Sequence, residues 1–327
     1  MLYLYLFGHL SVANCDGPAP WPAVDLEGRP GSLLAYLALA RGRFFARSEL
    51  LTVLWSEQTE IGSIRSFNTA LWRLRKALAR PPLEQTEIVV CDRRGAVGLR
   101  VDAKLQLDVD EFSSLVNPVL NKPLEQLDET HIEQLRRGVS LYRDDVLAGF
   151  TDDWALRARE LHRRILLNAL ARLMQVSTLA QDYASAIRYA QDILDRDTLR
   201  EEVHRELMRL FLLNGQRAMA LRQFELCRTA LRKELAIEPM RETMIAYQRI
   251  ADSAVRRTSE PSPSPVQGSP EDMRAPLAHD GKLPERHDSD LSLQELVSRA
   301  HWYVAQADAH LHRSTPLADE LGPRSPS

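Results

Sequence analysis

The stretch that best indicates the fold of the N-terminal part of the chain is Ser63–Ala79, which reads SIRSFNTALWRLRKALA. Apolar residues recur in it three and four positions apart: Phe67, Leu71, Leu74 and Leu78. This spacing places all four on one side of an α-helix, because a helix turns by about 100° per residue. We therefore predict an amphipathic helix over this stretch, ended by Pro81–Pro82.

The other side of this helix is polar and positively charged. It presents Arg65, Thr69, Trp72 and Lys76, flanked by Ser66, Asn68, Arg73 and Arg75. Long cationic side chains that reach phosphates, beside short polar ones that reach base edges, are typical of a DNA recognition helix. The alternative is an ordinary surface helix whose basic residues complement the macrodipole at its C-terminal end. That alternative does not explain the absence of acidic residues from Gly62 to Ala79.

The segments around this helix complete a known pattern. Residues 2–12 and 24–26 are predicted to be short strands, and two short helices are expected at Ser32–Ala40 and Arg47–Trp55. Residues 88–101 are predicted to form a hairpin with Arg93, Arg94 and Gly95 at its tip. Strands, three helices and a hairpin in this order indicate a winged helix-turn-helix, which we assign to residues 1–107.

Composition limits the class of protein. The 327 residues suggest about two domains. The net charge of the whole chain is −3, which argues against general coating of nucleic acid. Residues 31–80 are an exception: they carry eight basic and three acidic residues and form a basic island. Three scattered cysteines favour a reducing compartment, and no run of 18 apolar residues occurs, so we expect a cytoplasmic protein without a membrane span.

Residues 108–255 are expected to form an all-α repeat domain, with nearly continuous helix from Leu141. A 34-residue offset aligns apolar positions, including Ala186 with Ala220 and Ala190 with Phe224. This period, with alanine where paired helices touch, is typical of tetratricopeptide (TPR) repeats. The fold class we predict is therefore mainly α with a small β component: a winged helix-turn-helix followed by a TPR-like domain.

The C-terminal segment is predicted to differ from both domains. Residues 256–290 hold six of the 18 prolines and no aromatic residue, so we expect a disordered linker. Residues 291–313 carry an apolar stripe and a capping box, Ser292-x-x-Glu295, and are expected to form an amphipathic helix. Such a lone helix needs a surface to pack on: the repeat array, a protein partner or the same helix of a second copy. Residues 314–327 are expected to be a disordered tail.

No motif points to catalysis. The phosphate-binding loop GxxxxGK[ST], the dinucleotide turn GxGxxG, the elbow GxSxG and the pair HExxH are all absent from the sequence. The histidines are dispersed, so we expect no metal site and no cofactor. The sequence indicates a protein that is not an enzyme.

Several stretches resemble one known family, the SARP-type bacterial transcriptional activators, which join a winged helix-turn-helix to a bacterial transcriptional activator domain (BTAD). The resemblance covers about residues 2–254 in the order of the family. Its matching stretches are YLYLFGHLSV at Tyr3–Val12, LLAYLAL at Leu33–Leu39, SELLTVLW at Ser48–Trp55, ALWRLRKAL at Ala70–Leu78, LDVDEF at Leu107–Phe112, LYRDDVLAGF at Leu141–Phe150, DDWALRARE at Asp152–Glu160 and the run Leu199–Pro239.

The resemblance implies an activator that binds direct repeats in promoter DNA as two side-by-side copies. It also implies recruitment of the RNA polymerase holoenzyme through its sigma subunit. The DNA contacts that it implies are Arg65, Ser66, Asn68, Thr69, Trp72, Arg73, Arg75 and Lys76 in the helix, Arg43 and Arg47 near the second helix, and Arg93 and Arg94 in the wing. The polymerase contacts that it implies are Ser56, Glu57, Gln58, Thr59 and Glu60.

The sequence departs from the family at three places. The segment before the first helix reads DLEGRPGS, with Arg29 as its one basic residue. Ala46 stands where a serine usually caps the second helix, so capping shifts to Ser48 or is lost at about 1 kcal/mol. Trp72 occupies a face where small polar residues are usual, and it is expected to meet a thymine methyl group, a neighbouring copy or the hairpin.

The leading hypothesis is a promoter-specific transcription activator that acts as a homodimer on DNA. The alternative is a TPR-like protein-interaction module whose winged helix is a packing or dimer surface. A helical array that senses a small ligand is a third hypothesis, without specific residues behind it. The operator, the regulated genes and the activating signal do not follow from the sequence.

Overall fold

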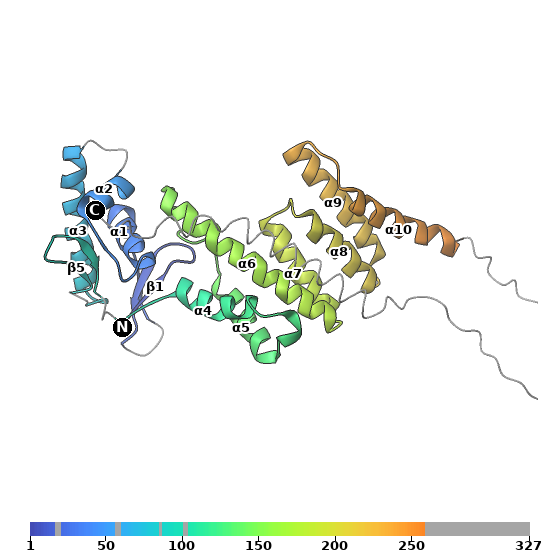
Figure 1. Ribbon diagram of the computed structural model, residues 1–327, viewed down its shortest axis with the longest axis horizontal. Coiled ribbons are helices and arrows are strands. Elements are labelled where there is room, and N and C mark those ends of the chain that lie inside the picture. Colours follow the sequence, from blue (N-terminus) through green and yellow to red (C-terminus); the bar gives the residue numbers. More distant parts are fainter. Residues whose placement is uncertain (17–20, 56–59, 85–86, 101–103, 259–327) are drawn as a thin grey trace, which may run out of the picture. The chain divides into compact units, whose positions relative to one another are not determined.

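The computed structural model describes residues 1–16, 21–55, 60–84, 87–100 and 104–258 (Figure 1). The linker, helix and tail predicted from residue 259 onward lie outside these ranges. Side chains at 60–62 and 253–258 are likewise left out of the description. No helix within the described ranges is both long and apolar enough to cross a bilayer.

The N-terminal strands form a sheet with one long-range partner. Its order is β3-β2-β1-β7, with antiparallel pairs except for the parallel pair β1–β7. The strands are β1 (Leu2–Tyr5), β2 (Ser11–Asn14), β3 (Ala23–Asp25) and β7 (Leu105–Leu107). Side chains alternate between faces along β1, so Leu2 and Leu4 are buried while Tyr3 and Tyr5 are half-buried.

Three helices and a small sheet follow, as the sequence predicts. The helices are α1 (Gly28–Leu39), α2 (Arg47–Leu54) and α3 (Glu60–Ala79). The second sheet has the order β4-β6-β5, made of β4 (Phe44–Phe45), β5 (Val89–Cys91) and β6 (Val97–Leu99). Helix α1 begins four residues before its predicted start, because Pro30 lies in the first turn, where a missing N–H breaks no helical hydrogen bond.

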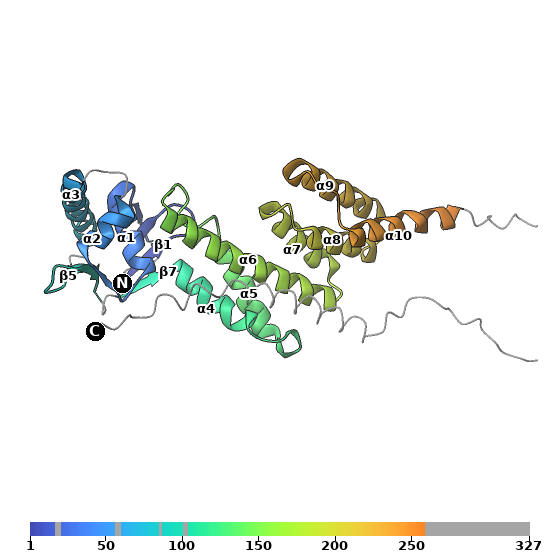
Figure 2. The same cartoon turned by 45° about the horizontal axis from the view of Figure 1, so that its top comes forward.

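Two helices that the sequence analysis did not separate come next, α4 (Asp108–Leu120) and α5 (Glu129–Leu141). They pack on each other and on α6 (Asp153–Leu179), as both views show (Figures 1 and 2). Gly138 allows the close approach of α5 to α4, since a Cβ there would lie 2.4 Å from Val116 Cγ2.

The predicted repeat helices follow as consecutive packed pairs: α6, α7 (Tyr183–Arg196), α8 (Glu201–Leu213), α9 (Arg217–Leu235) and α10 (Arg241–Thr258). The alanines aligned by the 34-residue offset, Ala186, Ala190 and Ala220, are fully buried. Helix α10 runs three residues past residue 255, the end predicted for the repeat domain.

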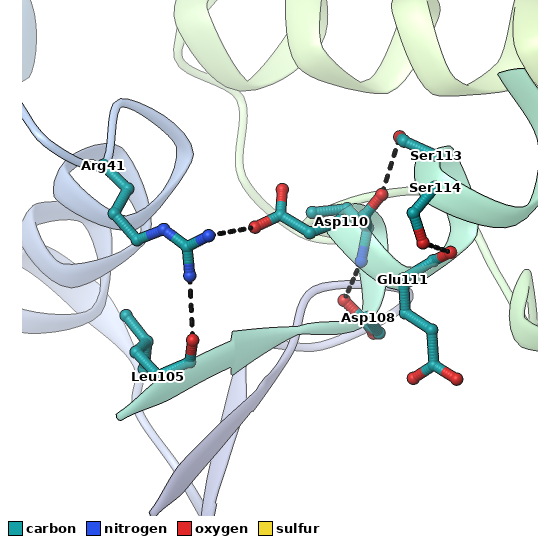
Figure 3. A network of polar contacts seen from close by, with 8 residues as sticks. Arg41, Leu105, Asp108, Asp110, Glu111, Ser113 and Ser114 are labelled. Carbon is teal, nitrogen blue, oxygen red and sulfur yellow. Dashed lines mark hydrogen bonds and ion pairs between the residues drawn. The ribbon is translucent and has the colours of Figure 1, made fainter. Parts of the chain in front are cut away.

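The junction between β7 and α4 ties the N-terminal module to the helical domain. Asp108 is buried, and its carboxylate accepts hydrogen bonds from the backbone N–H groups of Leu6, Phe7 and Val109. Beside it, the Arg41 guanidinium donates to Leu105 O at 2.8 Å and pairs with Asp110 at 3.3 Å (Figure 3). The loop after β1 also pairs with the segment before α6, through the bridge between Phe7 and Val146.

Candidate nucleic-acid interface

Helix α3 is fixed on its module by the predicted apolar stripe. Phe67, Leu71, Leu74 and Leu78 are all at most 5% exposed. The indole of Trp55, at the end of α2, packs edge-on against the Phe67 ring, with the ring centres 5.5 Å apart. The interpretation of this stretch as a seated amphipathic helix is confirmed, although the helix begins at Glu60 rather than Ser63.

The face of α3 opposite the stripe is exposed to solvent. It consists of Arg65, Asn68, Thr69, Trp72, Arg73 and Lys76. The guanidinium groups of Arg65 and Arg73 make no hydrogen bond or ion pair with any residue in the described ranges. The Thr69 hydroxyl donates to Arg65 O within the helix at 2.9 Å, and its oxygen still has capacity to accept. The helix thus presents unpaired positive charge beside polar side chains.

Two predicted contact residues have partners inside the module. Ser66 is half-buried, and its Oγ accepts a hydrogen bond from Trp55 Nε1 at 2.8 Å. Arg75 Nε donates to Val89 O at 3.2 Å, and its Nη2 lies 3.4 Å from Cys91 Sγ. Ser66 therefore holds α3 against α2, and Arg75 holds it against strand β5 of the hairpin.

The start of α2 offers a positive helix end. Ala46 is the N-cap, and its side chain caps no backbone N–H group. Ser48 does not take over this role. Of the two expectations, a shift of the cap to Ser48 or its loss, the second is therefore confirmed. The first N–H groups of α2 therefore have no partner within the helix, and Arg47 in the same turn is exposed. Arg43 is more constrained, because it pairs with Glu49 at 2.6 Å and lies over the Phe45 ring.

The hairpin β5–β6 forms the wing, and its tip is a hydrogen-bonded turn. Asp92 Oδ1 accepts from the backbone N–H groups of Arg94 and Ala96, both at 2.8 Å. Gly95 has φ +81°, a conformation that favours glycine. Arg93 and Arg94 are exposed on this tip, so two cations are carried on a turn of defined shape.

The predicted polymerase contacts are mostly outside the description. Ser56–Thr59 lie outside the ranges that the structure describes. Glu60 is the first residue of α3 rather than part of a loop. Sequence reasoning missed a cavity of about 640 Å³ beside α3, lined by the uncapped start of α1 and by Arg65, Thr69 and Arg73. Arg29 lines it too and pairs with Asp152 at 3.2 Å, which links the cavity to the helical domain.

Titratable groups with shifted pKa values lie away from this face. Burial raises the pKa of Asp108 to about 6, while its backbone hydrogen bonds act in the opposite direction. Burial also lowers the pKa of His162 and of His204 in the helical domain. Over the residues that the structure describes, no group of three or more His, Cys, Asp or Glu side chains is arranged to hold a metal ion.

Comparisons with known proteins agree with this architecture. Residues 22–95 match the family model "Transcriptional regulatory protein, C terminal", and residues 107–251 match "Bacterial transcriptional activator domain". The fold resembles the solved structure of Mycobacterium tuberculosis EmbR in complex with a low affinity phosphopeptide, with a TM-score of 0.60 and 18% identity. That match covers 77% of this chain and 65% of the EmbR chain. No curated protein matches the sequence.

The two family models occur in the order in which the structure places the winged module and the helical domain. The chain therefore carries the two domains that SARP-type bacterial transcriptional activators combine, a winged helix-turn-helix of the DNA-binding regulators followed by a bacterial transcriptional activator domain.

Proposed function

We propose that this protein binds direct repeats in promoter DNA as two side-by-side copies and recruits RNA polymerase through its sigma subunit. In this proposal residues 1–107 bind DNA, residues 108–255 form the activator domain, and the protein acts in the cytoplasm. The observation that carries it is the exposed face of α3, where Arg65, Arg73 and Lys76 surround short polar side chains.

The electrostatics of the interface give a measurable expectation. Arg73 and Lys76 on α3, Arg47 at the start of α2, and Arg93 and Arg94 on the wing are five exposed cations. If each neutralises one phosphate, the logarithm of the association constant falls against the logarithm of salt concentration with a slope of about −4 to −5. A slope near zero would contradict phosphate contact by this surface.

Base reading by α3 is tested by comparing two arginine variants. The full-length protein is titrated by fluorescence anisotropy with its own upstream region and with a random duplex of equal length. Arg65→Ala is expected to lower discrimination between the two duplexes, because a bidentate contact to guanine contributes about 1–3 kcal/mol. Arg249→Ala, an exposed arginine on α10, is the matched control and should change neither value. Equal loss on both duplexes would contradict base reading by Arg65.

Binding of two copies is tested on the same DNA. We expect a footprint over two direct repeats about one helical turn apart, and loss of one repeat should remove one copy. A footprint over a single site, or over an inverted pair, would contradict side-by-side binding.

Recruitment of polymerase is tested separately from DNA binding. Alanine substitution of Ser56–Glu60 is expected to reduce transcription by the holoenzyme in vitro and to leave operator affinity unchanged. Unchanged transcription with this variant would place the polymerase contact elsewhere.

A protein-interaction role of the helical domain alone has one observation in its favour. Leu212, Leu213 and Met219 are exposed near the turn between α8 and α9. This role predicts that removal of residues 1–107 leaves partner binding intact and that duplex DNA never competes. Salt-sensitive binding of the full chain to its own promoter would favour the transcription activator over the protein-interaction module.

A further inference from the structure

The indole of Trp72 is the feature of α3 that phosphate binding does not use. It is 58% exposed, although tryptophan has a large apolar surface. It lies among cations, since Arg65 and Lys76 are on the same face of the helix. Its N–H donates to no residue that the structure describes, so both the ring and its one donor are available to a ligand.

The ring is held in place from one side. Lys76 follows Trp72 by one helical turn, and its Nζ lies 4.5 Å from the centre of the indole ring. A cation over an aromatic face is attracted to it even at an exposed site. Lys76 therefore covers one face of the indole and favours one orientation of the ring, while more than half of the residue stays exposed.

The surrounding charge decides what this surface can meet. A second copy that brought the same face of its own α3 would place like charges opposite each other. A polyanion with an apolar group in reach of the helix fits better. In the major groove of DNA the apolar group on a base edge is the C5-methyl of thymine, next to its O4 acceptor. The indole offers a matching pair, an apolar ring and a single N–H donor.

We propose that Trp72 reads a thymine in each half-site by packing its indole against the C5-methyl group. This inference rests on the proposed function, because it requires α3 to lie in the major groove. It assigns to Trp72 a specificity role that differs from phosphate binding by Arg73 and Lys76 and from the guanine contact of Arg65.

The test changes the DNA rather than the protein: it removes the C5-methyl group of thymine. An operator is first selected from a random duplex pool with the full-length protein. Each thymine of one half-site is then replaced in turn by deoxyuridine, which keeps O4 and the base pair and lacks only the methyl. Burial of a methyl-sized group predicts about a fourfold loss of affinity at one position. 5-Bromodeoxyuridine, whose bromine is close in size to a methyl group, should restore affinity there.

Two variants tie that position to the indole. With Trp72→Ala, the affinity ratio between thymine and deoxyuridine at this position is expected to fall to about one. The matched control is Ile64→Ala, which shortens an exposed apolar side chain on another side of α3 and should keep the fourfold ratio. Because both side chains are exposed, the midpoint of thermal unfolding should stay unchanged in both variants, which checks the fold.

The outcomes separate this inference from the proposed function. Specific binding without a sensitive thymine, or a thymine effect that persists in Trp72→Ala, would overturn the role of Trp72 and leave DNA binding standing. Loss of cooperative binding of the second copy alone, with the thymine ratio intact, would also overturn it and assign the indole to contact between copies. Absence of salt-sensitive binding to any duplex would contradict the proposed function itself.

Discussion

Substitution of Asp108 by asparagine tests the junction between the two domains. The Asp108 side chain is 4% exposed. Its Oδ1 accepts from Leu6 N and Val109 N at 2.9 and 2.8 Å, and its Oδ2 accepts from Leu6 N and Phe7 N at 2.9 and 3.0 Å. Both oxygens face N–H donors, so the NH₂ group of asparagine must meet at least one donor and leave it without an acceptor. This change alone costs about 1–3 kcal/mol of unfolding free energy.

The effect of pH on this substitution follows from the raised pKa. Burial raises the pKa of Asp108 from 3.8 to about 6, so the folded state holds the proton more tightly than the unfolded chain. The resulting stabilisation is fully present below about pH 4 and is lost as the pH rises through 6. A difference of about two pKa units corresponds to about 3 kcal/mol. Asparagine does not titrate, so Asp108→Asn lacks this dependence.

The assay is urea unfolding of both proteins at a series of pH values, followed by circular dichroism. At pH 4 the variant should be less stable than the natural chain by about 1–3 kcal/mol. By pH 7 the natural chain should have lost about 3 kcal/mol relative to the variant, which brings the two close together or reverses their order. Asp110→Asn, which removes a surface ion pair with Arg41, is the control and should cost at most about 1 kcal/mol. Parallel curves for natural chain and Asp108→Asn would refute this reasoning.

Three further substitutions probe how the module positions α3. Gly31→Ala should lower the free energy of unfolding by at least about 2 kcal/mol, because the new Cβ would lie 2.2 Å from Leu26 O, which is backbone; a neutral result in urea unfolding would contradict this. Leu74→Ala, at a fully buried position, should cost about 2–5 kcal/mol in the same assay, and a cost below 1 kcal/mol would argue against a packed stripe. Arg75→Ala should free the wing from α3 and weaken specific and random duplexes alike in anisotropy titrations; a selective loss on the operator would assign Arg75 to base reading instead.

In the winged module, the local sequence was sufficient to predict a helix where its apolar residues recur with the helical period. The spacing of Phe67, Leu71, Leu74 and Leu78 predicted both the helix and its buried side, because packing and helical period agree there. The buried alanines of the repeat helices followed from the 34-residue offset for the same reason. Helix ends were less accurate: α1 and α3 begin earlier than predicted, since Pro30 and Gly62 do not interrupt a first turn.

Features that depend on distant partners could not be read from the sequence. Strand β7 exists because it pairs with β1, which lies about a hundred residues earlier in the chain. The role of Asp108 likewise depends on Leu6 and Phe7. Ser66 and Arg75 look like their exposed neighbours in a helical projection, yet Trp55 and Val89 engage them inside the module. The exposure of Trp72 excludes the expectation that the hairpin buries it.

Methylation interference on the promoter tests the central claim, that α3 enters the major groove, most directly. Dimethyl sulfate methylates guanine N7, which lies in the major groove, and adenine N3, which lies in the minor groove. We predict that methylated guanines in each repeat block binding by the natural chain, and that Arg65→Ala loses sensitivity at one of them. Interference confined to adenine N3, or sensitivity that is the same in Arg65→Ala, would contradict the placement of α3 in the groove.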